Sequence, residues 1–354
     1  MRTPSEPRNL IDVSQHQSSQ VGGHFRTTTR PRYERSGLGV EAFDSTTGGY
    51  RRVVAWLAAF GDIDLIGVEG TGSYGAGIAR HLTGKGLRVV EVDRPNRQAR
   101  HRAGKTDAID AIAAARAALS GTATGLPKTR TGPIEAIRVL TVARRSAAAE
   151  WVAILNQMRH LTFTAPDELR TRFQDLTPIT LVRTCAALKP RRSDDDIVRF
   201  TTLSTLRELG RRALFLREQK KRLDADMKPL IDDTAPGLIA VFGVGYHVAA
   251  TLLIAAGDNP HRIRSEAAWA HLCGVAPIPA SSGKVQRHRL NRGGNRQANS
   301  ALHKIMLTRM AYDDRTRAYM TKRTRDGKTL GETSRMLKRY IAREVYHHLP
   351  TTMT

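Results

Sequence analysis

The amino-acid sequence predicts an α/β domain in its first third, followed by a longer and mainly α-helical part. Two short apolar runs, Ile63–Val68 and Leu87–Val92, flank a helix-forming stretch at Ala76–Leu82. This strand–helix–strand order within about thirty residues is typical of a parallel or mixed sheet. Residues 134–160 and 205–232 then carry long helical patterns in which charged residues are interleaved with the apolar ones.

Residues 1–37 are polar and show no sustained periodicity, so we expect an atypical N-terminus that is disordered or altered. They contain one short apolar patch, Leu10–Val13, which includes Asp12. The flanks of this patch lack the apolar alternation expected of a first strand and its continuation. Globular sequence begins near Leu38, and residues 50–60 follow with apolar side chains at helical spacing.

Composition narrows the class of partner. The chain has 354 residues, enough for two or three domains, and a net charge of +24, which favours nucleic acid as its partner. From position 281 onward, 17 lysines and arginines stand against five acidic residues. The sequence holds no apolar run of 18 residues, no signal-like start and only two cysteines. We therefore expect a cytoplasmic protein without a membrane segment or disulfide framework.

The segment 276–300 joins a serine pair to a dense run of cations. Ser281 and Ser282 open it, and either hydroxyl is a potential nucleophile. The cations that follow within thirteen positions are Lys284, Arg287, Arg289, Arg292 and Arg296. A glycine-broken basic segment suits a polyanion such as nucleic acid. A solvated basic loop without a further role is the alternative interpretation.

Three acidic residues lie where predicted elements end or begin. Glu69 directly follows a buried strand, which places it at the carboxyl edge of the sheet. Asp107 and Asp110 are three positions apart at the start of a predicted helix, Ala108–Leu119, and so share one side of it. Clustered carboxylates require cations, and paired Mg²⁺ ions are the usual choice for phosphodiester chemistry. Helix capping by the aspartates, or a plain loop acid at Glu69, is the alternative.

A glycine pattern supports a competing interpretation. Gly70–Gly75 has the spacing GxGxxG between a strand and a helix, and Asp93 ends the next strand about twenty residues later. This is the fingerprint of a dinucleotide-binding protein. Glu69 weighs against it, because a carboxylate would lie beside the pyrophosphate. The high net charge also has no role in a small-molecule dehydrogenase.

The stretch Leu238–Leu253 has the pattern of a helix-hairpin-helix. An apolar helix ends near Gly243-Val244-Gly245, and a second apolar helix follows. In that pattern Gly243 and Gly245 leave backbone N–H groups at the second helix exposed to a phosphate. An ordinary helical hairpin is the alternative. We expect His247 to be a phosphate contact or a plain surface residue, because no second ligand lies at metal-binding spacing.

In this order the motifs resemble one family, the DEDD-type transposases of the insertion sequence 110 group. The resemblance is carried by Gly67–Gly75, Glu91–Arg97, Lys105–Ala111, Pro236–Ala256 and Gly274–Ala301. It implies a RuvC-type, RNase H-like domain and a mainly α transposase domain joined by a helical coiled coil. The corresponding divisions are residues 1–37 as an atypical N-terminus, 38–125 as the RuvC-like domain, 126–232 as the coiled-coil linker, 233–320 as the transposase domain and 321–354 as a basic helical tail.

The resemblance also implies a function and roles for individual residues. Its members recombine DNA as assemblies, guided by a structured bridge RNA, so we expect this chain to be a bacterial, nucleoid-associated enzyme that acts as a dimer or tetramer. Glu69, Asp107 and Asp110 match the acidic ligands that hold Mg²⁺ in the family. Ser282 is the expected nucleophile and Ser281 the close alternative. The expected nucleic-acid contacts are Lys105, Gly243, Gly245, Lys284, Arg287, Arg289, Arg292 and Arg296.

One family feature has only a weak match in this sequence. The family opens with a strand that carries the first acidic ligand, and Asp12 is the only local candidate for it. Without that ligand the chain would be an inactive DNA-binding remnant of a transposase. A RuvC-like metal-dependent nuclease or junction resolvase is a further alternative, and such an enzyme would not need Ser282.

Overall fold

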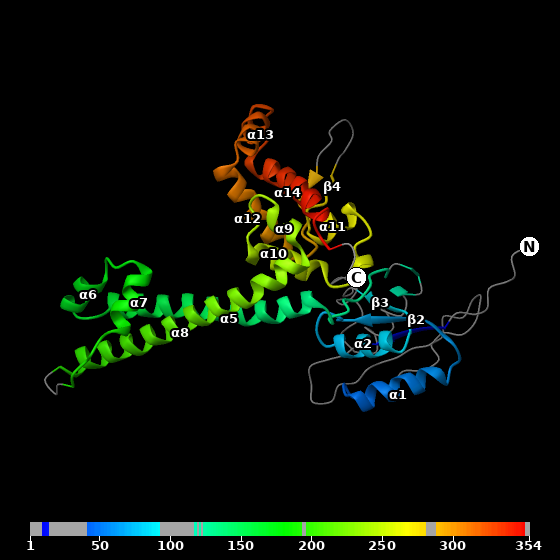
Figure 1. The fold of residues 1–354 in the computed structure, drawn as a ribbon, viewed down its shortest axis with the longest axis horizontal. Helices are drawn as coiled ribbons and strands as arrows, with labels where there is room; N and C mark the ends of the chain where they lie inside the picture. Colours follow the sequence, from blue (N-terminus) through cyan, green and yellow to red (C-terminus); the bar gives the residue numbers. More distant parts are fainter. Residues whose placement is uncertain are drawn as a thin grey trace, which may run out of the picture. The chain divides into compact units, whose positions relative to one another are not determined.

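The computed structural model divides the chain into two compact units, Met1–Thr129 and Arg130–Thr354 (Figure 1). The structure describes residues 41–92, 117–118, 120–121, 123–192, 196–280 and 288–350, and the backbone of residues 9–13. The described chain is mostly helical and contains two small sheets. No helix among these residues is long and apolar enough to span a membrane.

The first unit is built on a parallel sheet of three strands in the order β1-β2-β3. The strands are β1 (Asn9–Val13), β2 (Ile63–Glu69) and β3 (Val89–Val92), and the helices are α1 (Thr47–Ala58) and α2 (Ala76–Gly84). The predicted strand–helix–strand unit is therefore confirmed. Most of the predicted helix at residues 108–119 lies outside the described residues.

The two helices share a core with one face of this sheet. Ile66 and Val68 of β2 are fully buried, and they pack with Leu57 of α1 and Ile78 of α2. The opposite face of the sheet carries a smaller apolar cluster that includes Val90. Because both faces of β2 are covered, its sequence reads as a continuous apolar run rather than an alternating one.

Strand β1 corrects the expectation that residues 1–37 contain no regular element. Asn9–Val13 pair in parallel with β2, from Asn9 opposite Ile63 to Val13 opposite Val68. Alternation was the wrong criterion for this segment, because strands of parallel sheets are often apolar on both faces. The short run around Asp12 is compatible with that pattern. The structure says nothing of the other residues in this range.

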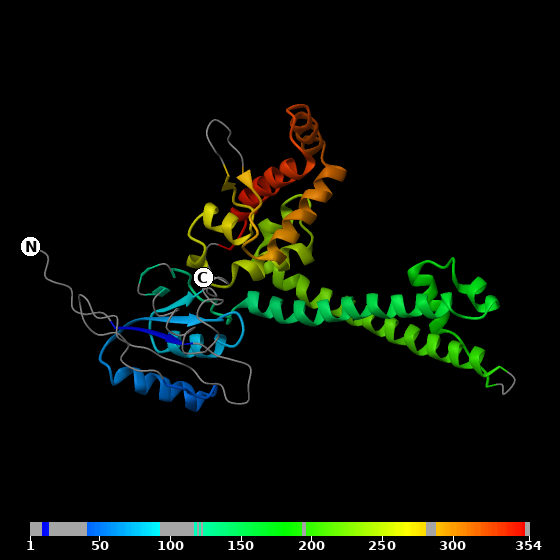
Figure 2. The same ribbon diagram turned by 180° about the vertical axis from the view of Figure 1, so that it is seen from behind.

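Two long helices dominate the first part of the second unit. Helices α5 (Pro133–Phe163) and α8 (Ile197–Thr234) lie side by side, as Figures 1 and 2 both show. Between them in sequence come α6 (Asp167–Phe173), which follows Pro166, and α7 (Pro178–Ala186), which begins at a proline. The shared core includes Leu155, Met158, Leu169, Phe173, Leu181, Leu206 and Ala213. Both predicted long helices are thus confirmed.

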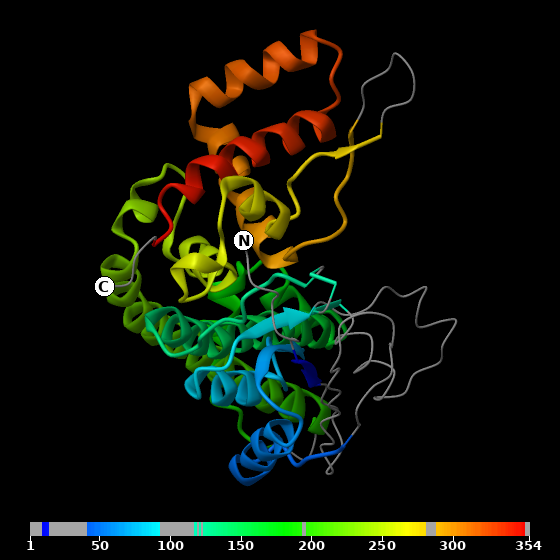
Figure 3. The same cartoon turned by 90° about the vertical axis from the view of Figure 1, so that its right-hand side faces the viewer.

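The remaining elements form the rest of the second unit (Figure 3), in which the apolar sequence of α10 is mostly buried. They are α9 (Pro236–Ala240), α10 (Tyr246–Ala256), α11 (Glu266–Leu272), β4 (Ile278–Pro279), β5 (His288–Arg289), α12 (Arg296–Tyr312), α13 (Asp314–Arg325) and α14 (Leu330–Tyr346). Ile137 of α5 and Ile231 of α8 belong to the same core. Leu337 and Ile341 of α14 do as well.

Candidate functional site

Glu69 is the last residue of β2 and lies at the carboxyl edge of the three-stranded sheet. The register of the neighbouring strand aligns Asp12 with Gly67, two positions before Glu69. Positions two apart on a strand share a face of the sheet. The backbone therefore brings the positions of Asp12 and Glu69 to the same face on adjacent strands, as a shared cation site requires.

A tight glycine-rich turn follows Glu69. Gly70 has a φ of +68°, and its carbonyl accepts a hydrogen bond from the Gly75 N–H at 3.0 Å. A Cβ atom at Gly75 would lie 2.4 Å from the Glu69 carbonyl oxygen, so only glycine fits there. Thr71 is buried and donates a hydrogen bond to the Glu91 carboxylate on β3. Gly70 and Gly75 of the GxGxxG pattern thus have a role in closing the turn.

The other predicted residues of the acidic site lie outside the described residues. These are Lys105, Asp107 and Asp110, as well as Asp93 of the competing dinucleotide pattern. Among the side chains that the structure does describe, no group of three His, Cys, Asp or Glu could hold a metal. The donor type at Glu69 and Asp12 does fit Mg²⁺, which prefers carboxylate oxygens.

The predicted serine loop connects the two strands of a short antiparallel pair. Ile278 of β4 pairs with Arg289 of β5, and Pro279 pairs with His288. The segment between them holds Ser281, Ser282, Lys284 and Arg287, all of which lie outside the described residues. The structure therefore describes the base of this loop, where its two ends meet.

Two glycines close the base of the loop. Gly274 and Gly294 both have positive φ values, +65° and +81°. A Cβ on Gly294 would lie 2.6 Å from the Gly274 nitrogen and 2.7 Å from the Leu272 carbonyl oxygen. A Cβ on Gly274 would lie 2.5 Å from the Gly293 carbonyl oxygen. The two backbone segments can approach this closely only because neither residue has a side chain.

Asn299 of α12 stabilises this close approach of the two backbone segments through hydrogen bonds. Its Nδ2 donates to the carbonyl oxygens of Cys273 and Gly274, at 2.9 and 3.2 Å. Its Oδ1 accepts from the Lys338 Nζ of α14 at 3.0 Å. Burial lowers the pKa of Lys338, and the nearby Arg335 lowers it further. Asn295 completes the junction by capping α12, since its Oδ1 accepts from the Ala298 N–H.

The predicted cations beyond the loop face solvent. Arg289, Arg292 and Arg296 are all exposed, and none forms an ion pair with another described residue. Arg296 is the first residue of α12, directly after the capped junction. Unpaired arginines on an exposed surface are available to phosphates, which they bind in a bidentate manner.

Two helices joined by a turn are present where the helix-hairpin-helix pattern is predicted, and the first of them is short. Helix α9 ends at Ala240, and residues 241–245 turn into α10, with Gly243 at a φ of +87°. A Cβ there would lie 3.2 Å from the Ile305 side chain. Gly245 is exposed, and no side chain caps the helix after it. The N–H groups at the start of α10 are thus suited to an anion.

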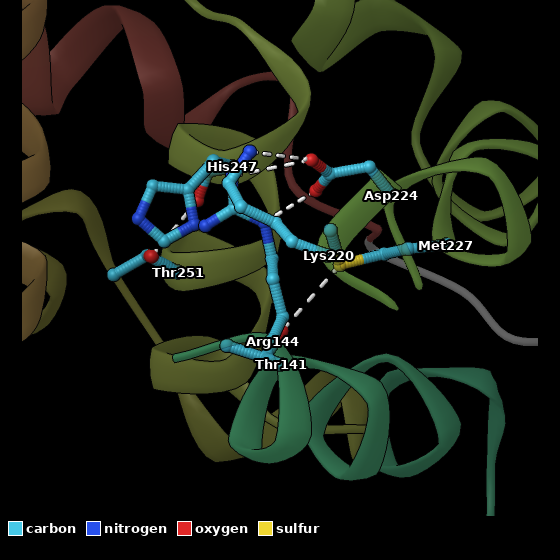
Figure 4. Close-up of polar contacts among 7 residues, drawn as sticks. All are labelled: Thr141, Arg144, Lys220, Asp224, Met227, His247 and Thr251. Atoms are coloured by element: carbon cyan, nitrogen blue, oxygen red, sulfur yellow. Dashed lines mark hydrogen bonds and ion pairs between the residues drawn. The ribbon is translucent and has the colours of Figure 1, made fainter. Parts of the chain in front are cut away.

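His247 lies next to this turn and is half-buried, so its interpretation as a plain surface residue is wrong (Figure 4). Burial, followed by repulsion from Arg144 and Lys304, lowers the pKa of His247 to about 4. Its Nδ1 is inaccessible to solvent and has no hydrogen bond within the described part of the chain. The ring is therefore neutral near pH 7, and any positive charge here comes from its neighbours.

Those neighbours were missed at the sequence level. Arg144 of α5 forms an ion pair with Asp224 of α8, to which Lys220 also binds at 3.0 Å (Figure 4). Arg145 donates to the Thr251 hydroxyl of α10 at 3.2 Å. Together with Lys304 of α12, these residues bring cations from three helices to the start of α10. Only the charged pair Arg144-Arg145 on an apolar helix could have signalled this in the sequence.

Comparisons with known families cover both units. Residues 34–166 match a model described as a transposase, of the DEDD type found in IS110 elements. Residues 237–321 match the model of the transposase IS116/IS110/IS902 family. A search among curated proteins gave no match. The first model spans Glu69, Asp107 and Asp110 but not Asp12, and the second spans the turn before α10 and the serine loop.

Proposed function

Because the chain belongs to the IS110 family of DNA transposases, we propose that it cuts and rejoins DNA through a serine nucleophile. Ser282 is the proposed nucleophile and Ser281 its alternative. The observation that supports this most is the closed base of their loop. Gly274 and Gly294 meet there in backbone contact, which holds the loop between α11 and α12. A nucleophile needs such a fixed support to reach a phosphate in line.

The acidic residues of the first unit are the proposed cation ligands. An RNase H-like fold would gather Asp12, Glu69, Asp107 and Asp110 at one edge of the sheet. The parallel pairing of β1 with β2 supports this, since it aligns Asp12 beside the end of the Glu69 strand. It also favours an intact first strand over an inactive remnant. When bound, Mg²⁺ would polarise the phosphoryl oxygens of the DNA.

Side chains of the protein would perform the cleavage and rejoining of the DNA strand. The serine Oγ attacks the phosphorus and loses its proton, the Oγ–P bond forms, and the DNA oxygen leaves as a hydroxyl that takes up a proton. In the reverse direction a DNA hydroxyl attacks the phosphoserine and releases the serine. Arg289 and Arg292 would stabilise the charge on the phosphate oxygens. The bond energy is conserved, so no ATP is required.

Binding of nucleic acid would involve several other surfaces. We propose that the N–H groups around Gly243 and Gly245 contact a phosphate without reading its base. Lys105, Lys284, Arg287 and Arg296 are further proposed contacts with DNA or with a bridge RNA. Exposed apolar residues on α5 and α8, such as Val142 and Phe215, support a homo-oligomer formed through a coiled coil.

A cleavage and conjugation assay tests this function. The full chain is incubated with DNA of the element ends, bridge RNA and Mg²⁺, and then resolved under denaturing conditions. We expect a protein–DNA conjugate that disappears with EDTA and in Ser282→Ala, but persists in Ser300→Ala, whose exposed serine lies on α12. A Ser282→Ala and Ser281→Ala double variant that still cuts DNA would identify a nuclease or resolvase. Binding without any cleavage would identify a DNA-binding remnant.

A further inference from the structure

A cavity of about 490 Å³ lies in the second unit, and neither the predicted serines nor the predicted acidic residues line it. Helices α12, α13 and α14, drawn in orange to red in Figure 3, form its walls together with the turn before α10. The residues that matter most in its lining are Phe242, Arg309, Arg315, Tyr319, Tyr340 and Glu344. Neither the family resemblance nor the proposed chemistry assigns a role to this cavity.

Flat aromatic side chains form much of its lining. Phe242 and Tyr340 are each 52% exposed although they border a cavity. Tyr319 packs edge-on against Tyr340, with ring centroids 5.9 Å apart and an interplanar angle of 88°. This contact supports the Tyr340 ring from one side. Exposed rings held in this way are suited to stacking a planar group, and every nucleobase has a planar face.

The charged groups of the lining are fixed, with one exception. Arg309 donates to both carboxylate oxygens of Glu344, at 2.7 and 3.1 Å, and to the Phe242 carbonyl oxygen at 2.9 Å. Asp313 caps α13, accepting from the N–H and the hydroxyl of Thr316. Arg315 is exposed and has no ion pair among the described residues. Arg315 is therefore an exposed cation, without an ion pair in the described part of the chain, that borders the aromatic cavity.

One lining residue of the cavity, Phe242, is adjacent in sequence to the proposed phosphate contact. Phe242 directly precedes Gly243 in the turn before α10, and Arg309 fixes the carbonyl of Phe242. A strand whose phosphate is held at this turn would carry its adjacent nucleotide past the Phe242 ring. Because the aromatic rings and the turn belong to one compact unit, a single strand could reach both.

We propose that this cavity binds one unpaired nucleotide of a DNA or RNA strand. The base stacks on Tyr340 and Phe242, the Arg309–Glu344 pair meets its polar edge, and Arg315 neutralises its phosphate. This inference rests on the proposed nucleic-acid function of the second unit. It adds a preference for a single strand, or for a duplex from which one nucleotide has left the stack.

The test compares the full-length protein with two matched variants, Tyr340→Leu and Tyr312→Leu. Tyr312 is 77% exposed on α12 and does not line the cavity, so its replacement is the control. Binding is measured by fluorescence anisotropy for three probes: a ten-nucleotide DNA strand, its RNA equivalent and a blunt 20-base-pair duplex. We expect Tyr340→Leu to weaken binding of at least one single strand about tenfold and Tyr312→Leu to leave it unchanged. The duplex affinity should be the same for all three proteins.

A second readout uses a single strand with 2-aminopurine at one position. Stacking on tyrosine should quench its fluorescence with the unmodified protein and with Tyr312→Leu, but not with Tyr340→Leu. Equal loss in both variants, or no loss in either, would overturn the proposal while leaving the transposase function intact. Failure of the unmodified protein to bind any of the three probes would instead contradict the proposed function. The DNA and RNA arms show which strand supplies the nucleotide.

Discussion

At the scale of single residues, a few backbone positions decide how the serine loop is held. Gly274 and Gly294 allow two chain segments to meet, and Asn299 ties them to α12 and α14. The sequence indicated a glycine-broken basic loop but not this closure. Glycine pairs far apart in sequence reveal their contact only in three dimensions. The serines themselves lie outside the described residues, so their role stays a prediction.

Gly294→Ala should open the base of the loop. The new Cβ would meet backbone atoms at 2.6 and 2.7 Å, and the φ of +81° adds strain. We expect the free energy of unfolding to fall by about 2 kcal/mol or more, measured by urea denaturation. Gly327→Ala is the control, because its φ is +74° but nothing lies within 4 Å of a Cβ there. Equal losses in both variants would show that strain alone, rather than the close approach, is responsible.

His247 should make the stability of the second unit depend on pH. Its pKa is lowered to about 4 in the folded state, against about 6.5 in an unfolded chain. Between these values the unfolded chain binds more protons, so the free energy of unfolding falls as the pH falls through this window. In His247→Gln we expect the slope of the unfolding free energy against pH to be smaller, by an amount that corresponds to up to about one bound proton.

The pH prediction is checked by urea denaturation at pH 7, 5.5 and 4.5. His303→Gln serves as the control, since His303 is exposed on α12. Identical slopes for His247→Gln and the unmodified protein would contradict the burial of a neutral imidazole at this position. The cations around the ring act in the same direction as burial, and only Asp224 opposes them.

At the scale of elements, the sequence predicted helices and buried strands well. The spacing of apolar residues identified α5 and α8, and continuous apolar runs identified β2 and β3. It failed at β1, where alternation is not required of a strand in a parallel sheet. It also could not assign α14 to the core, because the basic residues on its surface obscured the stripe formed by Leu337, Ile341 and Val345.

Asp258 should be essential for the start of α5. It is buried, and its Oδ1 accepts a hydrogen bond from the Ile134 N–H at 2.9 Å. Asp258→Ala removes this acceptor from a helix N-terminus, and we expect a loss of about 1–3 kcal/mol in the free energy of unfolding. Asp258→Asn keeps an oxygen there and should lose clearly less. A comparable loss in both variants, measured by urea denaturation, would contradict a capping role.

At the scale of the whole molecule, charge was the most informative property of the sequence. A net charge of +24 indicated nucleic acid, and the family matches to both units agree with that. Composition could not locate the cationic cluster beside α10, because its residues come from α5, α8 and α12, which are distant parts of the chain. The cavity lined by Phe242 and Tyr340 is likewise a product of tertiary packing.

The salt dependence of DNA binding should reveal which arginines contact phosphates. Each such contact contributes about 0.9 to the slope of log K against log salt concentration. We expect Arg292→Gln to lower that slope by about 1 and to weaken binding evenly across sequences. Arg211→Gln on α8, where Arg211 lies 3.7 Å from Glu208, should not change it. An unchanged slope in Arg292→Gln would remove Arg292 from the interface.

The most direct test of the proposed serine mechanism is to locate the covalent link between protein and DNA. After reaction with end DNA, bridge RNA and Mg²⁺, the conjugate is digested with nuclease and protease and its peptides are analysed by mass spectrometry. The proposed serine mechanism requires a nucleotide on Ser282, or on Ser281, that is absent after metal removal and in Glu69→Gln. A nucleotide attached to any other residue, or an undiminished link in Glu69→Gln, would contradict it.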